Sequence, residues 1–95
     1  MLKAMTLALT LVATPLAAET KDTCLSVGTL ATSVMQARQA GVDLGRAMEI
    51  AGDSSSIQAM VLMAYGEPRF STDEYQQNAV ADFANTWMLS CYEAK

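Results

Sequence analysis

The sequence predicts an all-α fold: a small four-helix domain whose first and last helices run antiparallel and are joined by one disulfide. Three observations lead to this prediction. Apolar residues recur every three or four positions, which is the spacing of a helix face rather than the alternation of a strand. Glycine or proline follows each of the first three periodic segments, at Gly41, Gly52 and Gly66. The chain has only two cysteines, and they lie near the two ends of the periodic region, Cys24 and Cys91.

The N-terminus has the pattern of a secretory signal. Lys3 precedes an apolar run from Met5 to Ala13, and the small residues Ala17 and Ala18 follow. The run is shorter than the roughly 20 residues that a membrane-spanning helix needs. We therefore expect residues 1–18 to be a cleaved signal peptide; an uncleaved N-terminal anchor is the alternative. Cleavage would leave 19–95 as a single helical domain, periplasmic or secreted, with no stable membrane anchor.

The first helix is expected from about Thr23 to Ala40, with Asp22 or Thr23 as its N-cap and Gly41 after its end. Gly28 lies inside this helix, where glycine costs about 1 kcal/mol relative to alanine. We expect a neighbouring helix to pack closely against Gly28. The predicted apolar stripe consists of Cys24, Val27, Leu30, Ala31, Val34 and Met35 and continues to Arg38.

A short second helix is expected from about Leu44 to Ala51, after the N-cap residue Asp43 and before Gly52. Its predicted buried face consists of Leu44, Ala47, Met48 and Ala51.

The third helix is expected from about Ser56 to Tyr65, with an N-cap supplied by residues 53–56 and an end set by Gly66 and Pro68. Its predicted buried side consists of Ile57, Met60, Val61 and Ala64. Leu62 and Met63 make the segment apolar nearly all round, which indicates a central position in the fold.

The fourth helix has the clearest pattern, within residues 70–95. Ser71 and Glu74 have the spacing of a capping box, and Phe70 and Tyr75 have that of a hydrophobic staple. The predicted stripe consists of Val80, Phe83, Ala84, Trp87 and Cys91. We expect Phe83 and Trp87 to be buried against the first helix.

An even, widely spaced cysteine pair in an exported protein predicts a disulfide. A bond between Cys24 and Cys91 would close a long loop, for which chain entropy gives roughly 4 kcal/mol. It would also set the first and last helices side by side and antiparallel. The opposite end would then collect groups from three separate segments of the chain.

The groups expected at that end are the candidate partner-binding residues Arg38, Gln39, Tyr65, Glu67, Arg69 and Tyr75. Aromatic residues with arginine are typical of interface anchors. The alternative is a helix connection whose aromatics only cover the core. If the residues bind a partner, Tyr65→Ala and Arg69→Ala should weaken binding and leave the thermal midpoint nearly unchanged.

The composition excludes several kinds of chemistry. The chain has no histidine, so catalytic triads and most zinc sites lack an essential residue. We expect no catalytic residue, no cofactor and no metal, and we read Met60 and Met63 as core rather than as a copper site. The net charge of −4 and the lack of a basic run exclude nucleic acid as an expected partner.

Three segments carry a family resemblance: the ending Arg38-Gln39-Ala40-Gly41, the turn from Ala64-Tyr65 to Pro68, and Phe83 to Cys91. They resemble small uncharacterised secreted α-helical proteins of proteobacteria and their phages. The Pro68 link and the closing Cys91 are also similar in plan to type VI secretion immunity proteins of the Rap1a/Tai kind. That resemblance implies a periplasmic helical protein stabilised by disulfides.

The expected function is therefore that of an exported, non-catalytic small helical protein that binds another protein in the periplasm or outside the cell. Two alternatives stay open: an immunity-type inhibitor of a cell-wall toxin, and a periplasmic stress chaperone.

Overall fold

The computed structural model describes the backbone of residues 15–94 and the side chains of residues 23–94. The predicted signal peptide, 1–18, lies outside the described residues except for the backbone of residues 15–18. Its cleavage therefore stays a prediction. The first described helix begins at Pro15, eight residues before the expected start at Thr23.

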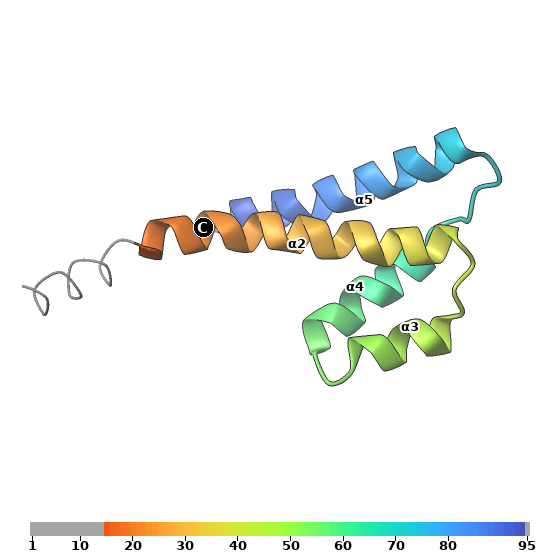
Figure 1. Cartoon of the computed structure of the whole chain (residues 1–95), viewed down its shortest axis with the longest axis horizontal. Coiled ribbons are helices and arrows are strands. Elements are labelled where there is room, and N and C mark those ends of the chain that lie inside the picture. Colours follow the sequence, from red (N-terminus) through yellow and green to blue (C-terminus); the bar gives the residue numbers. More distant parts are fainter. Residues whose placement is uncertain (1–14, 95) are drawn as a thin grey trace, which may run out of the picture.

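Four helices make up the described chain: α2 (Pro15–Gln39), α3 (Leu44–Ala51), α4 (Ser55–Tyr65) and α5 (Asp73–Glu93). Residues 15–94 contain no strand, so the predicted all-α class is confirmed. The long helices α2 and α5 lie side by side, and the α3–α4 hairpin packs along another side of α2 (Figure 1). The central helix is thus α2, which contacts each of the other three helices. The prediction that the third helix is central was wrong.

The disulfide is confirmed. Cys24 on α2 and Cys91 on α5 are bonded, with their Cα atoms 5.5 Å apart. Because Cys24 lies toward the start of α2 and Cys91 near the end of α5, the bond joins antiparallel helices, as predicted. Gly28, one turn further along α2, permits the close approach. A Cβ atom at this position would lie 2.6 Å from Cγ of Met88 on α5, well inside contact distance.

The main core lies between α2, α4 and α5. Its buried members are Ala31, Met35, Met60, Ala64, Phe83 and Ala84. Phe83 is buried as expected, whereas Trp87 is only partly buried and packs at the edge of this cluster together with Val27 and Val34. The predicted stripes of α2 and α5 therefore face each other.

A smaller cluster joins α3 to α4 through Ala47, Ala51 and Val61. Two expectations fail here. Leu44 was expected on the buried face of α3 but is 42% exposed. Leu62 and Met63, expected to be buried, are 55% and 53% exposed, because α4 packs on one side only.

The helix ends mostly follow their capping residues. Asp43 accepts a hydrogen bond from the backbone N–H of Arg46 at 3.2 Å, as predicted. Gly41 has a φ of +86°, and the Val42 N–H donates to the Ala37 carbonyl at 3.0 Å, which is the Schellman ending that favours glycine.

The start of α5 differs from the prediction. Thr72 is the N-cap and accepts from the Tyr75 N–H at 3.3 Å, so Ser71 and Glu74 do not form a capping box. The helix begins one residue later than expected, and Tyr75 takes the position where a capping box needs Glu or Gln. The Phe70 and Tyr75 rings still contact each other, with their centroids 6.0 Å apart.

Candidate interaction surface at the turn end

We call the end of the molecule opposite the disulfide the turn end. It comprises the last turn of α2 with the loop after it (residues 38–42), Tyr65 at the end of α4, and the link 66–72 that leads into α5 (Figure 1). The structure brings Arg38, Gln39, Tyr65, Glu67 and Arg69 into one hydrogen-bonded group there. Tyr75 joins this group through its contact with Phe70.

Gln39 holds the link in place. Its side-chain Nε2 donates to the Pro68 carbonyl at 2.9 Å, and its Oε1 accepts from the Phe70 N–H at 2.8 Å. Its backbone carbonyl accepts from Nε of Arg69 at 3.0 Å. The side chain is only 3% exposed. Because it is buried, Gln39 offers little surface to a partner, and its predicted role in binding one stays a prediction.

The position of Gln39 in the sequence carried a signal for this burial. It lies four residues after Met35 and eight after Ala31, on the buried stripe of α2. A polar residue on a buried stripe needs hydrogen-bond partners, and the backbone of an irregular link supplies them.

The two arginines of the turn end also bind backbone. Nε of Arg38 donates to the Glu67 carbonyl at 3.1 Å, and the Arg38 guanidinium lies 5.3 Å from the centre of the Tyr65 ring, a cation–π distance. Arg69 covers Gly41, where an added Cβ would lie 2.9 Å from its Nη2. Both guanidiniums therefore lie near carbonyls at helix ends, which favour positive charge.

Tyr65 connects α4 to the loop after α2. Its hydroxyl donates to the Val42 carbonyl at 2.7 Å, and its ring contacts both core clusters. Partial burial raises the pKa of this phenol; the positive charge of Arg38 opposes the rise, and the negative charge of Asp43 adds to it. Since Tyr65 and Arg69 both make tertiary hydrogen bonds, the expectation that their removal leaves stability unchanged must be revised.

The accessible side chains at and beside this end include Met63, Glu67, Arg69, Phe70 and Tyr75, and we call these five the turn-end surface. Tyr75 is 58% exposed. Four of the five, all except Arg69, line a groove of about 290 Å³ between α4 and α5, whose lining includes the buried residues Met35 and Phe83. Asp82 lines the same groove.

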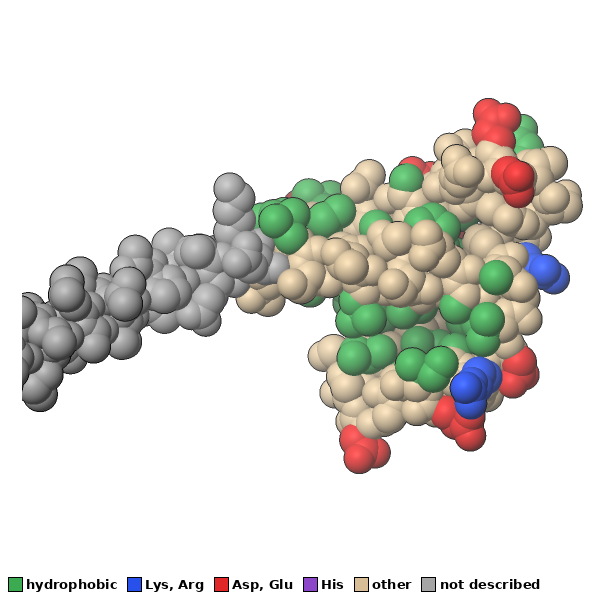
Figure 2. Space-filling view, viewed as in Figure 1, with side chains coloured by type: hydrophobic (Ala, Val, Ile, Leu, Met, Phe, Trp, Pro, Cys, Tyr) green, Lys and Arg blue, Asp and Glu red, His purple; other side chains and the backbone are tan. Residues whose placement is uncertain are grey.

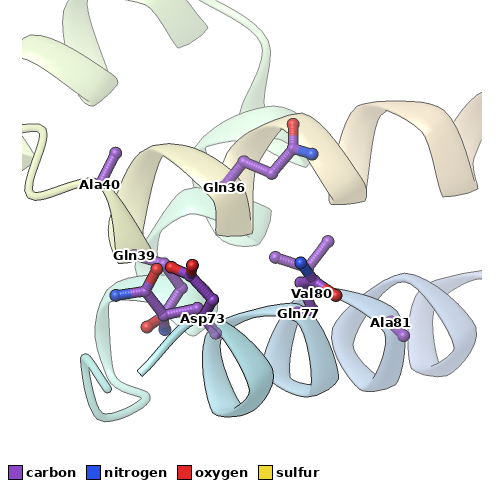
Figure 3. Close-up of a pocket in the computed structure, with 8 residues that line it drawn as sticks. Gln36, Gln39, Ala40, Asp73, Gln77, Val80 and Ala81 are labelled. Carbon is purple, nitrogen blue, oxygen red and sulfur yellow. The ribbon is translucent and has the colours of Figure 1, made fainter. Parts of the chain in front are cut away.

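A second groove at this end, of about 300 Å³, lies between the end of α2 and the start of α5 (Figure 3). Amide side chains dominate its lining: Gln36, Gln39, Gln76 and Gln77. Asp73 is its one charged lining residue. The groove thus offers no pair of titratable groups for acid–base chemistry.

An apolar groove of about 300 Å³ lies where α2 meets the α3–α4 hairpin, with Val34, Ile50 and Ile57 among its lining residues. In Figure 2 apolar side chains gather over this junction. Neither this groove nor the one between α4 and α5 was predicted from the sequence. Two apolar residues outside the predicted stripes, Ile50 on α3 and Met63 on α4, indicated apolar surface that the predicted packing leaves uncovered.

The described residues contain neither a cluster of metal-binding side chains nor a membrane-spanning helix. Among them, no group of three or more Cys, Asp or Glu side chains could hold a metal ion. None of the described helices is both long and apolar enough to cross a membrane.

Comparison with known proteins identifies no relative: no family model, no curated protein and no solved structure matches the chain. The resemblance to small secreted helical proteins therefore stays a prediction, and function must be argued from the molecule itself.

Proposed function

We propose that this chain is an exported, non-catalytic helical protein that binds another protein through its turn-end surface. The observation that carries the proposal is the exposure of Tyr75, Phe70 and Met63 around a groove, beside or on a link that Gln39 holds by two side-chain hydrogen bonds. Exposed aromatics and methionine are enriched where proteins meet.

The rigidity of the link adds support. The link residues Pro68 and Phe70 are bonded to Gln39, and Arg69 is bonded to the end of α2. A surface that is ordered before binding loses less conformational entropy when a partner docks. A groove formed in advance is therefore a better binding site than a flexible link of the same composition.

Two observations support export. The disulfide is compatible with an oxidising compartment, since such bonds persist mainly in exported proteins. The pattern of residues 1–18 is that of a secretory signal. N-terminal sequencing of protein recovered from periplasm or medium should give a mature start near Glu19. An intact Met1 in the membrane fraction would favour a retained anchor instead.

Site-specific photo-crosslinking in cells tests the binding proposal. A benzoylphenylalanine at position 75 should give a discrete, heavier adduct with a protein. The matched control is the same residue at position 50, because Ile50 is 73% exposed but lies on α3, away from the turn end. Equal adducts from both positions, or none from position 75, would count against the turn-end surface. If the adduct contains a cell-wall hydrolase, the immunity alternative becomes the specific form of this proposal.

A further inference from the structure

We propose that the space between α4 and α5 binds an amphipathic α-helix of the partner, with lysine or arginine beside its apolar stripe. This inference rests on the proposed function and adds the chemistry of the partner. It starts from two grooves that have no lining residue in common but are both lined by residues of α2, α4 and α5. The turn-end groove lies over Met35, and a second groove, of about 340 Å³, lies over Val27 and Leu30 nearer the disulfide. We call the two together the α4–α5 trough.

The walls of the trough are helical and long enough for a helix. On α4 the lining residues Ser56, Met60 and Met63 are spaced four and three apart, so they form one face. On α5 the turn-end groove is lined from Tyr75 to Thr86, which at 1.5 Å per residue is about 16 Å, or three turns. Helices bind in such grooves with anchors at i, i+3 or i+4, and i+7.

The main core fills the inner part of the space between α2, α4 and α5, and a bound helix would lie outside it, over the two grooves. α2 contacts both α4 and α5, and these two lie on different sides of it (Figure 1). A helix between α4 and α5 would cover Met63 and Tyr75, and it would cover Trp87, which is only partly buried. The methionines at this site can adapt to the shape of a partner side chain.

The negatively charged residues of the trough favour a partner that carries positive charge. Glu67 and Asp82 line it, and neither groove is lined by a lysine or an arginine. The two nearby arginines, Arg38 and Arg69, each donate a hydrogen bond to a backbone carbonyl. Complementarity therefore favours positive charge on the incoming helix.

The same charges disfavour a second copy of this chain as the occupant. A two-fold dimer presents the same patch on both subunits, so Glu67 and Asp82 would meet an identical acidic patch. Like charges at an interface are unfavourable.

A designed peptide tests the inference directly. The probe is an amphipathic peptide of about 18 residues, five helical turns, with leucine along one face and lysine on both flanks. The control peptide has glutamate in place of every lysine. Trp87 is the single tryptophan of the chain and lines the trough, so its fluorescence reports binding, and calorimetry gives the stoichiometry. We expect saturable one-to-one binding of the lysine peptide that weakens with added salt, and none of the glutamate peptide.

Charge reversal locates the site. Asp82→Lys should weaken binding of the lysine peptide by about 3- to 10-fold, since an attraction is replaced by a repulsion. Asp53→Lys is the matched control, because Asp53 is also an exposed acid but lies in the turn between α3 and α4. It should change the affinity by less than about 2-fold. Equal effects of the two variants, or binding of the glutamate peptide, would overturn the inference.

The outcomes separate the inference from the proposed function. A crosslinked adduct at position 75 without peptide binding would support the protein-binding function and contradict a helical partner in the trough. Peptide binding without an adduct at position 75 would support the trough as a helix site and count against a turn-end partner in the cell. Dimerisation that competes with binding of the lysine peptide would make a second copy the occupant and overturn the inference.

Discussion

The two ends of the α2–α5 pair are held together by different chemistry. At one end a covalent bond joins Cys24 to Cys91, and the helices approach closely where Met88 packs over Gly28. At the other end the helices are joined through a link whose backbone is bound by Gln39, Arg38 and Arg69. The first end is stabilised by one strong constraint, the second by several weaker ones that depend on each other.

This difference explains why the polar residues of the turn end divide into two groups. Gln39 and Tyr65 have donors or acceptors committed to holding the link and the loop. Glu67 and Tyr75 have exposed side chains and line a groove. Stability measurements and binding measurements should therefore respond to different residues at this end.

The largest expected effect is loss of the disulfide. Cys24→Ala with Cys91→Ala should lower the free energy of unfolding by roughly 2 to 5 kcal/mol, because the unfolded chain gains the freedom that the bond removes. Alanine is preferred to serine, since Cys24 is fully buried and a hydroxyl there would lack water. Urea unfolding of variant and wild type gives the difference.

The reduced wild type provides the control for this prediction. It should unfold at nearly the same urea concentration as the double variant. If the oxidised and reduced proteins are equally stable, the disulfide does not contribute to the free energy of unfolding, and the disulfide end is not held by a strong covalent constraint.

The next largest effect is expected at the polar end. Gln39→Ala leaves the Phe70 N–H and the Pro68 carbonyl without their present partners, so the free energy of unfolding should fall by about 2 to 3 kcal/mol. Gln36→Ala is the matched control, because Gln36 lies on the same helix but is exposed. It should change stability by less than about 0.5 kcal/mol. Equal effects would mean that solvent replaces the bonds of Gln39.

The sequence predicts a structural feature well where a residue allows few structural roles, as a single cysteine pair, a helix-ending glycine or a capping aspartate does. Two cysteines allow only one intramolecular pair, and Gly41 and Asp43 mark helix ends through local geometry. These features depend on neighbours in sequence or on a unique partner. The helix order, the disulfide and the antiparallel pair could therefore be predicted.

The features that the sequence did not predict are contacts set by tertiary packing. Gln39 bonds to residues 29 and 31 positions later in the chain, and periodicity gives no such partner. α4 is apolar nearly all round, yet it buries one side only, because α2 and not α4 lies at the centre. The grooves beside α4 follow from that arrangement. Met63, outside the predicted stripe, indicated apolar surface on α4, but the position of that surface relative to α5 is set by tertiary packing.

A smaller effect is expected from Tyr65→Phe at neutral pH. The variant keeps the ring in both core clusters and removes only the hydroxyl that donates to the Val42 carbonyl. A single net hydrogen bond contributes about 0.5 to 1.5 kcal/mol, which is the expected loss of unfolding free energy. A loss of 3 kcal/mol or more would show that the hydroxyl organises the turn end beyond its one bond.

The last prediction uses the pKa of Tyr65, which partial burial raises above its ordinary value of 10.0. Above about pH 10 the unfolded chain releases this proton while the folded chain still holds it. The unfolded state then binds fewer protons, so the free energy of unfolding falls as pH rises. Tyr65→Phe lacks this loss, and the advantage of wild type over the variant should shrink between about pH 9 and about pH 11. An advantage that stays constant over this range would show that the phenol of Tyr65 is as well solvated in the folded protein as in the unfolded chain.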